Sequence, residues 1–375
     1  MICRLIDEQR GAVSRDAVVL VFAMLLLVTA IVPPCVAQDN LYTVTVPLDP
    51  LDPQAQQNAY KDALDRVLIR VTGSTDPVEL EDLDAIFSTP SQYVLRFRAR
   101  GQDKLEVSFD GDAIVELLRQ RRHTIWVADR PLTMVWLAVD WGRGEREILA
   151  ADTAARFPDG SRSVDRNAML RERVEETARR RGIPILLPLL DTEDREKVSF
   201  GDIWGGFDQR LLKASKRYGA SSILAGRVRI DSSGQNRWTY YFADEKFSWL
   251  GEPEEVIDKV ADTLAALFAI RGDAVLDTYS LTVDGIDSLQ AYGRVQQLID
   301  NLGVVEDFRL KSVIGNKIEY AVSIYGDIER LDKALTGSGM LAPIVMSNFA
   351  DYGAEGKQSP VEFSDPTRLE FSYLP

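Results

Sequence analysis

The sequence is poor in the two side chains that most often carry metal and redox chemistry. Its 375 residues include two cysteines and one histidine. The cysteines, Cys3 and Cys35, both precede residue 38, so a chain beginning at Gln38 would contain no thiol. Such a chain can form no disulfide, has no cysteine nucleophile and lacks the usual ligands of a structural zinc site. We therefore expect no metal and no cofactor.

The single histidine, His123, follows a run of basic residues at 119–122. A histidine acts as a general base only when a proton donor lies within hydrogen-bond reach, and chain adjacency does not establish that geometry. We expect His123 to be a surface residue.

Phosphate-binding and hydrolase motifs are also missing. The chain has no P-loop, and Gly142–Glu147 lacks the third glycine of a dinucleotide fingerprint. Gly337–Gly339 precedes a strand pattern and is not a nucleophile elbow. The acidic clusters lack the spacing of a calcium loop, so we expect helix caps and solvated loops. These clusters are Asp49 with Asp52, Asp110 with Asp112, and Asp191–Glu196. No catalytic residue can be assigned.

Positive charge is in short supply, since the net charge is −14. Nucleic-acid binding needs a basic surface, so we expect no nucleic-acid partner. The same balance argues against electrostatic attachment to anionic lipid. With 45% hydrophobic and 27% charged residues, the composition is that of a globular protein with a solvated acidic surface.

The N-terminus carries the pattern of an export signal. Arg4, Arg10 and Arg15 precede an apolar run at Ala17–Val32, and small residues follow up to Ala37. This pattern predicts a secretory signal peptide at residues 1–37, cleaved after Ala37, and a periplasmic mature protein with no membrane contact. The run is long for a signal and short for a membrane span, so an inner-membrane anchor facing the periplasm remains an alternative.

After the signal, strand and helix patterns alternate and predict an α/β (α+β) fold of three small units. The first and third units read strand, helix, strand, strand, helix, strand, which is the split-βαβ order, and the middle unit is βαββα-like. The expected divisions are an N-terminal domain at 38–142, a middle domain at 143–273, a C-terminal domain at 274–349 and a tail at 350–375.

Individual elements follow from apolar spacing. In the N-terminal domain we expect helices at Gln54–Val71 and Asp112–Arg121, and strands at Leu41–Pro47, Tyr93–Arg98, Leu105–Phe109 and Thr133–Val139. In the C-terminal domain we expect helices at Ile286–Leu302 and Ile328–Leu335, and strands at Tyr279–Val283, Val304–Val313, Lys317–Ile324 and Met340–Val345. Arg368–Leu374 alternates apolar and polar residues and could add an edge strand.

The middle domain is organised around Gly205–Phe242. A helix ends at Gly219, an apolar strand occupies Ser222–Ile230, and an aromatic strand occupies Arg237–Phe242. Gly219 and Gly226 are expected to serve a turn and close packing, because no glycine-rich loop precedes a helix here. We therefore interpret this stretch as a core.

Two further features of the middle domain bear on function. The charged segment Asp191–Val198 is expected to be a surface loop. The aromatic side chains of Trp238, Tyr240 and Tyr241 could stack on a sugar, but aromatic residues are ordinary strand formers. A half-buried strand is the preferred interpretation.

Several segments between Leu41 and Asp152 together resemble a known family. They are Tyr42–Val46, Asn58–Leu64, Leu68–Gly73, Pro131–Trp141 and Ala150–Asp152. They resemble the domain-of-unknown-function family 2066, exported proteins of gammaproteobacteria, and the likeness extends through Gly226. That family has no agreed activity, so the resemblance implies export and no site residues.

A second resemblance concerns Tyr218–Val228. This segment is similar to one in exported α/β domains of the curli-secretion and penicillin-binding-protein-activator lipoproteins and of the Tol-system propeller protein. Those domains bind protein partners, so the resemblance implies a protein-binding scaffold.

These observations lead to one expectation and two alternatives. We expect an exported, non-enzymatic envelope protein that acts as a protein-binding or assembly module with an envelope protein partner. One alternative is an enzyme that acts on cell-wall or polysaccharide material with a pair of carboxylates. The other is a periplasmic scaffold anchored in the inner membrane. A cleft that gathers two acids, one with a raised pKa, would favour the enzyme.

Overall fold

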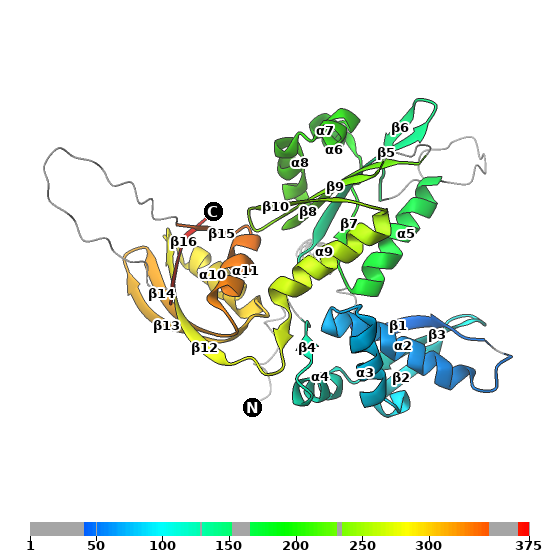
Figure 1. The fold of residues 1–375 in the computed structure, drawn as a ribbon. Helices are drawn as coiled ribbons and strands as arrows, with labels where there is room; N and C mark the ends of the chain where they lie inside the picture. The colour runs from blue at the N-terminus through cyan, green and yellow to red at the C-terminus, as the bar shows by residue number, and fades with distance from the viewer. Residues whose placement is uncertain are drawn as a thin grey trace, which may run out of the picture. The chain divides into compact units, whose positions relative to one another are not determined.

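A computed structural model describes residues 41–49, 51–127, 130–151, 166–230, 235–344 and 367–374. The expected signal peptide, its cleavage position and both cysteines lie outside the described residues. From Leu41 onward the chain clusters as one unit in which helices and several separate sheets alternate (Figure 1). The predicted α+β class is confirmed. The domain boundaries after residues 142, 273 and 349 stay predictions.

The N-terminal part is a small antiparallel sheet covered by helices. Its strand order is β1-β3-β2. Helix α2 packs on the sheet because apolar residues recur every three or four positions, and it ends at Gly73 in the left-handed conformation. The elements of this part are β1 (Thr43–Pro47), α2 (Ala55–Thr72), α3 (Pro77–Ile86), the 3₁₀ turn η1 (Pro90–Tyr93), β2 (Val94–Ala99), β3 (Lys104–Phe109), α4 (Gly111–Gln120) and β4 (Thr124–Ile125).

One strand expected in the N-terminal sheet lies elsewhere. Strand β5 (Thr133–Gly142) pairs with β8 (Ser222–Arg229) in the sheet of the middle region. The seven residues from Thr133 to Val139 are all buried. A strand buried on both faces needs helices on both sides of its sheet. The N-terminal sheet therefore has three strands and lacks the fourth strand of the split-βαβ order.

The middle sheet has the strand order β10-β9-β8-β5-β6, with β7 also paired to β5. The two-residue turn between β9 and β10 has positive φ at Ala243 and Asp244, as a tight hairpin requires. The elements of this region are β5, β6 (Glu145–Ile148), α5 (Arg166–Arg181), β7 (Ile185–Leu186), α6 (Thr192–Lys197), α7 (Phe200–Gly205), α8 (Asp208–Ser215), the 3₁₀ turn η2 (Lys216–Tyr218), β8, β9 (Arg237–Phe242), β10 (Glu245–Leu250), α9 (Pro253–Phe268) and β11 (Ile270–Arg271).

Helices cover the two faces of the middle sheet unequally. Helices α5 and α9 pack on the face that carries Leu137, Leu224 and Tyr240. Helices α6, α7 and α8 lie on the opposite side and cover β5 and β8, as Figure 1 shows. The buried residues of this second core come from β5 and β8 but not from β9 or β10. The part of this face formed by β9 and β10 is therefore not covered by any of the described helices.

The segment Asp191–Val198 differs from its predicted loop. It forms helix α6, and Asp194 within it is fully buried. The Asp194 carboxylate accepts bonds from Leu190 N at 2.9 Å and Arg217 Nη1 at 3.0 Å. Buried charge is tolerated when it is paired and hydrogen-bonded in this way. Periodicity over six residues is too short to distinguish such a helix from a charged loop.

The C-terminal sheet has the order β13-β14-β12-β16-β15. Without β16, this is the order of a split-βαβ unit. The C-terminal segment was expected to add an edge strand, but β16 is inserted parallel to β12 and antiparallel to β15. The elements are β12 (Leu276–Asp284), α10 (Leu289–Asn301), β13 (Val305–Ile314), β14 (Lys317–Tyr325), α11 (Ile328–Gly337), β15 (Leu341–Pro343) and β16 (Arg368–Tyr373).

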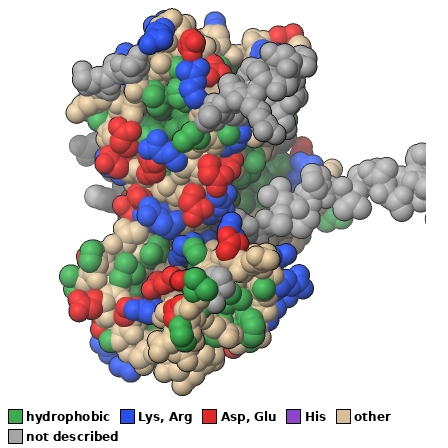
Figure 2. Space-filling model, turned by 90° about the vertical axis from the view of Figure 1, so that its right-hand side faces the viewer, with side chains coloured by type: hydrophobic (Ala, Val, Ile, Leu, Met, Phe, Trp, Pro, Cys, Tyr) green, Lys and Arg blue, Asp and Glu red, His purple; other side chains and the backbone are tan. Residues whose placement is uncertain are grey.

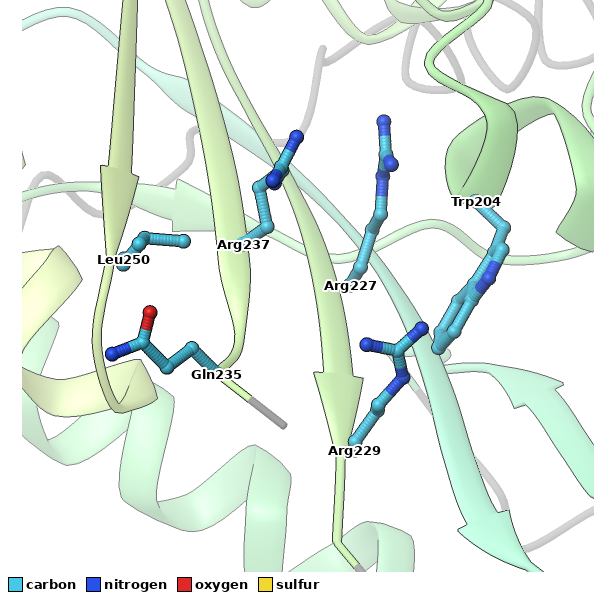
Figure 3. A pocket seen from close by; sticks show the side chains of 6 residues that line it. All are labelled: Trp204, Arg227, Arg229, Gln235, Arg237 and Leu250. Carbon is cyan, nitrogen blue, oxygen red and sulfur yellow. The ribbon is translucent and has the colours of Figure 1, made fainter. Parts of the chain in front are cut away.

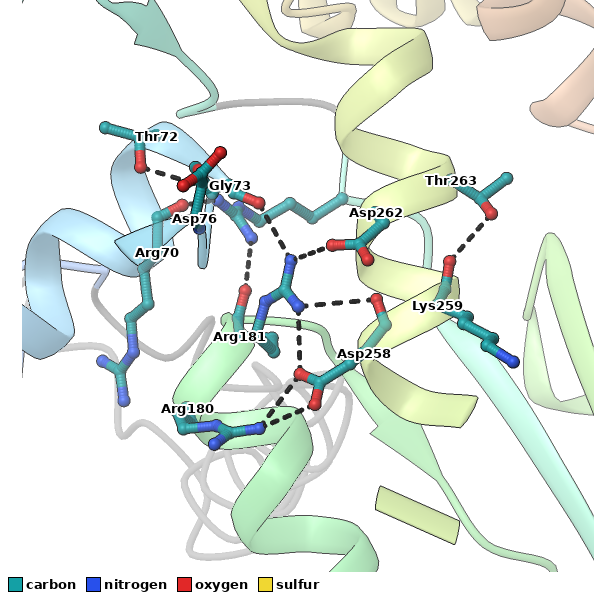
Figure 4. A network of polar contacts seen from close by, with 12 residues as sticks. Arg70, Thr72, Gly73, Asp76, Arg180, Arg181, Asp258, Lys259, Asp262 and Thr263 are labelled. Carbon is teal, nitrogen blue, oxygen red and sulfur yellow. Dashed lines mark hydrogen bonds and ion pairs between the residues drawn. The ribbon is translucent and has the colours of Figure 1, made fainter. Parts of the chain in front are cut away.

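Three arginines, Arg70, Arg130 and Arg181, join the N-terminal part to the middle region. We call them the buried arginine cluster. Figure 4 shows Arg70 and Arg181. Arg181 donates to the Gly73 carbonyl at 2.9 Å, to Asp258 at 2.9 Å and to Asp262 at 2.6 Å. Because the cluster binds the C-terminal ends of α2 and α5, its positive charge also offsets the negative ends of two helix dipoles.

Among the described residues, Arg130 bonds to backbone carbonyls alone. Its guanidinium donates to the carbonyls of Arg181, Gly182, Arg70 and Trp126 at 2.5–3.1 Å. It also lies over the Trp126 ring, 3.9 Å from the ring centroid. Burial lowers the pKa of Arg130, and the neighbouring Arg70 lowers it further. The carbonyl oxygens are therefore the groups that hold this side chain in place.

Elsewhere many charged side chains at the surface form ion pairs. On the face in Figure 2, Lys and Arg side chains alternate with Asp and Glu over the middle of the molecule. Arg173 pairs with Glu254 and Arg180 with Asp258, which links α5 to α9. Exposed pairs of this kind each contribute about 0–1 kcal/mol. Single arginines without an ion pair occur at several other places, so it is the grouping of three of them on neighbouring strands that identifies a surface of interest.

Candidate functional site

The one histidine does not lie at the surface. The His123 side chain is 12% exposed, with Nε2 3.2 Å from Asp82 and Nδ1 3.8 Å from Glu79. Both carboxylates come from α3, which the sequence did not predict to approach residue 123. No nucleophilic side chain bonds to this imidazole among the described residues, so its observed role is to link α3 to the segment after α4.

The aromatic residues of β9 do not form a sugar platform. Trp238 is 1% exposed and Tyr240 is fully buried under α5 and α9. Tyr241 points to the other face, is half-buried and donates a hydrogen bond to Asp208. The interpretation as an ordinary packed strand is confirmed.

The two glycines of the central stretch have the expected packing roles. Gly219 has φ +64° and caps the turn after α8. A Cβ at Gly226 would lie 2.4 Å from the Trp238 ring and 2.6 Å from Leu137. Only glycine fits at such a close approach. These contacts account for both residues without a phosphate ligand.

The predicted acidic caps are observed at two of the three clusters. Asp110 caps α4 by accepting from Ala113 N, and Asp191 caps α6 by accepting from Asp194 N. Within the described ranges, no group of three or more His, Cys, Asp or Glu side chains is placed to hold a metal ion.

The uncovered part of the middle sheet holds a hollow of about 430 Å³. Figure 3 shows its lining: Trp204, Arg227, Arg229, Gln235, Arg237 and Leu250. A second hollow of about 320 Å³ shares Arg227, Arg237 and Leu250 with the first. Its other lining residues are Thr239, Lys246, Ser248 and Trp249. We call the two adjoining hollows the cationic groove.

Strand alternation and register bring the arginines together. Arg227 and Arg229 lie two positions apart on β8, so their side chains project to the same face. Arg237 on β9 pairs directly with Arg227, and Leu250 on β10 pairs with Arg237. Like charges directly opposite each other on neighbouring strands destabilise a sheet. The fold therefore keeps a repulsive pair at this position.

Among the described residues, none of these three arginines lies within 4.0 Å of a carboxylate oxygen, and none donates a side-chain hydrogen bond. Asp208 lies near enough to Arg227, and Asp140 near enough to Arg229, for each arginine to help lower the pKa of that carboxyl. Arg227 lies against the backbone of Gly206, where a Cβ would come within 2.7 Å of Nη2. Arg229 lies over Trp204, 4.9 Å from the ring centroid. Because a guanidinium has five N–H donors, most of the donors in the groove are available to an incoming acceptor.

The rim of the groove combines aromatic rings with one paired lysine. Trp204 stacks on Phe200 with ring centroids 5.1 Å apart, which fixes the ring against which Arg229 rests. At the other end Lys246 bonds Asp208 at 2.6 Å. The Lys246 contact helps lower the pKa of Asp208, although burial opposes the shift. A rigid aromatic wall and flexible cations suit an anionic ligand that has some apolar surface.

Two neighbouring acids, Asp65 and Asp84, lie outside the groove, and the pKa of Asp65 is raised. Burial and the nearby Asp84 raise the pKa of Asp65 to about 6. Lys61 bonds Asp84 at 2.8 Å, and the side chains of that pair are 56% and 42% exposed. Neither acid lines either hollow of the groove. This carboxylate pair therefore lies apart from the cationic groove.

Residues 36–127 match the family model of a domain of unknown function (DUF8605). This finding corrects the resemblance drawn from Leu41–Asp152, which named a different family. The match ends before β5, the strand that belongs to the middle sheet, so it covers the three-stranded N-terminal part. The strand and helix patterns on which the mistaken resemblance rested are shared by many small α/β domains.

The wider comparisons add no relative. No curated protein and no solved structure matches the chain. No helix in the described part of the chain is both long and apolar enough to traverse a lipid bilayer.

Sequence reasoning missed the groove, although one signal was present. Arginines at alternate positions of β8, with an arginine opening β9, indicate that one face of an apolar hairpin is cationic. Trp204 and Lys246 had no such signal, because they reach the groove from other elements.

Proposed function

We propose that this protein is a protein-binding module whose cationic groove receives an acidic segment of a partner protein. The observation that carries the proposal is the group of three unpaired arginines, Arg227, Arg229 and Arg237, on an uncovered sheet face. An arginine can bind a carboxylate through two parallel hydrogen bonds. Three guanidinium groups gathered on one sheet face therefore offer several such sites to an acidic segment.

The charge balance favours a protein partner over a nucleic acid. The chain as a whole carries −14, so a long polyanion meets repulsion beyond the groove. A short acidic segment places its charge on the arginines alone. The flanking Trp204 ring and Leu250 offer apolar contact that a peptide side chain can use. The local positive charge of the groove and its mixed polar and apolar lining therefore favour a short acidic peptide.

Titration of the protein with a fluorescein-labelled octapeptide of alternating Glu and Thr tests the proposal. The double variant Arg227→Ala/Arg237→Ala should weaken binding about a hundredfold, at about tenfold for each lost charge-assisted contact. Fluorescence anisotropy gives the Kd of each protein. Raising ionic strength from about 0.15 M to about 1 M should also weaken binding, because the Debye length falls from about 8 to about 3 Å.

A matched control separates the groove from net charge. Arg271→Ala/Arg309→Ala removes the same charge from two side chains that are 72% and 83% exposed and lie outside the groove. The control should bind the peptide as the unchanged protein does. Equal losses in both double variants, or no measurable binding of the peptide by the unchanged protein, would reject the groove as the binding site. Tighter binding of polyphosphate than of the peptide would reject the protein partner.

We also propose that the protein is exported to the periplasm after cleavage following Ala37. The support is the basic, apolar and small-residue order of residues 4–37. Mass spectrometry of the protein from the envelope fraction should give Gln38 as the first residue. Recovery of peptides from Ala17–Val32 in the same fraction would instead support the anchored form.

A further inference from the structure

Strand β10 ends the middle sheet beside the groove. It pairs with β9 on one side, and no described strand pairs with its other side. An unpaired edge presents a row of backbone donors and acceptors that can accept another strand. The residues whose backbone groups face this open side follow from the hairpin geometry.

The tight turn at Ala243 and Asp244 makes Phe242 and Glu245 the closing, hydrogen-bonded pair. Hydrogen-bonded and non-hydrogen-bonded pairs alternate along an antiparallel ladder. The backbone groups of Lys246, Ser248 and Leu250 therefore point away from β9.

Two observed contacts agree with this alternation. Gly251 N donates to Asn236 O at 3.3 Å, as the next bonded pair beyond Leu250 requires. The Leu250 carbonyl accepts a bond from Lys259 Nζ at 3.3 Å, so it does point away from β9. The N–H groups of Lys246 and Ser248 have no backbone partner among the described residues.

The same three residues carry their side chains on the groove side of the sheet. Lys246, Ser248 and Leu250 are exposed and all line the second hollow. Arg237 lies one strand further in, directly opposite Leu250. A strand added beside β10 would lie about 4.8 Å away, and every second side chain would project over the groove. A glutamate in that position reaches toward the Arg237 guanidinium across a leucine and a serine.

We propose that the acidic partner segment adds to β10 as a further strand of the middle sheet, with alternate carboxylates directed at Arg237. This inference rests on the proposed function and specifies how the partner binds. Backbone bonds to β10 supply affinity, and the cationic groove supplies preference for acidic residues at every second position. The intervening side chains meet Phe247 and Trp249, whose stacked rings lie 5.9 Å apart on the other face.

Ser248→Pro tests strand addition without disturbing the existing ladder. The Ser248 N–H is not used in pairing with β9, and proline is tolerated at such edge positions. The variant removes the central donor of the open edge and should weaken binding of the alternating Glu–Thr octapeptide about tenfold or more. Ser248→Ala, which keeps the N–H, should bind like the unchanged protein.

N-methylation of the peptide gives a second measurement that leaves the protein intact. In an antiparallel added strand the Glu amides point to β10, whereas in a parallel one the Thr amides do. Methylation of one set should abolish binding, and methylation of the other set should leave the Kd unchanged. Equal binding of both methylated peptides would overturn strand addition.

The outcomes distinguish the two proposals. If Ser248→Pro binds normally while Arg227→Ala/Arg237→Ala does not, the groove binds through side chains alone and strand addition is rejected. Circular dichroism shows whether Ser248→Pro is folded. If it is not, binding of the methylated peptides to the unchanged protein tests strand addition instead. If the unchanged protein does not bind the acidic peptide, the proposed function itself fails.

Discussion

The buried arginine cluster and the cationic groove place the same residue type in opposite environments. Arg70, Arg130 and Arg181 are buried or nearly so, and backbone carbonyls accept most of their hydrogen bonds. Arg227 and Arg237 bond to no described residue through their side chains and face each other across two strands. The first group stabilises the junction of two regions. The second lowers the stability of its own sheet and leaves its donors available for binding.

Replacement of a buried arginine should have the largest effect. Arg181→Met leaves Asp258 without one of its two partners and the Gly73 carbonyl without a donor. Because Asp258 and Asp262 are 31% and 59% exposed, no charge is left fully buried, and the loss of unfolding free energy should be about 1–3 kcal/mol. Urea unfolding measures this loss. Arg180→Met is the matched control, because Arg180 binds the same Asp258 but is 45% exposed, and it should cost about 1 kcal/mol or less. Equal losses would mean that burial does not distinguish the two arginines.

The next largest effect on stability is expected at Asp65 on α2, where two carboxylates lie close together as the two arginines do in the groove. The pKa of Asp65 is about 6 in the folded protein against 3.8 ordinarily. Because the folded-state pKa is raised, its contribution to stability is full below pH 3.8 and is lost as the pH rises through 6. Asp65→Asn should therefore gain about 1 kcal/mol at pH 7 relative to the unchanged protein, after allowance for partial exposure.

Thermal unfolding of Asp65→Asn and of the unchanged protein at pH 4 and pH 7 measures the change in stability at each pH. The gain should be confined to the higher pH. Asp62→Asn, an exposed change on the same helix, should show a much smaller pH dependence, because Asp62 is the smallest of the causes that raise the pKa of Asp65. A gain at pH 4 equal to that at pH 7 would contradict the assignment.

The smallest expected effect is a gain in stability, whereas Arg181→Met is expected to cause a loss. Arg227→Leu removes one of two like charges that face each other across strands, so stability should rise by about 0.2–1 kcal/mol. Urea unfolding at low salt checks this, and the gain should shrink at high salt because screening already weakens the repulsion. Arg309→Leu, which has no arginine opposite it, should give no gain. A loss of stability in Arg227→Leu would show that the groove arginines are structural.

Local patterns in the sequence were sufficient to predict most elements. Helix α2 and strands β8 and β9 follow from apolar spacing and from glycines at their ends, and each was predicted within a few residues. Which strands pair with each other could not be predicted from local patterns. Residues 133–139 have a buried-strand pattern that fits any sheet covered on both faces, and only β8 as a neighbour decides which sheet it joins.

Only part of the candidate site could be predicted from the sequence. The sequence contains Arg227, Arg229 and Arg237, but it was the apolar residues between them that led to the interpretation as a core. That interpretation holds for one face of the hairpin, where Leu224 and Val228 are buried. Whether the other face is covered depends on how far α7 and α8 extend over the sheet. Trp204 reaches the groove only because of that placement.

The insertion of β16 between β12 and β15 has a consequence for the order of folding. Ser280 pairs with Arg368, and β15 has no other partner in the described sheet. Pairing of residues so far apart in the chain closes a long loop and is slow to form. While the chain is being synthesised, β12 and β15 are both made before β16, the strand that pairs with each of them. The C-terminal sheet is thus completed late, and until then the edges of these two strands are where the nascent chain is most exposed to wrong pairing.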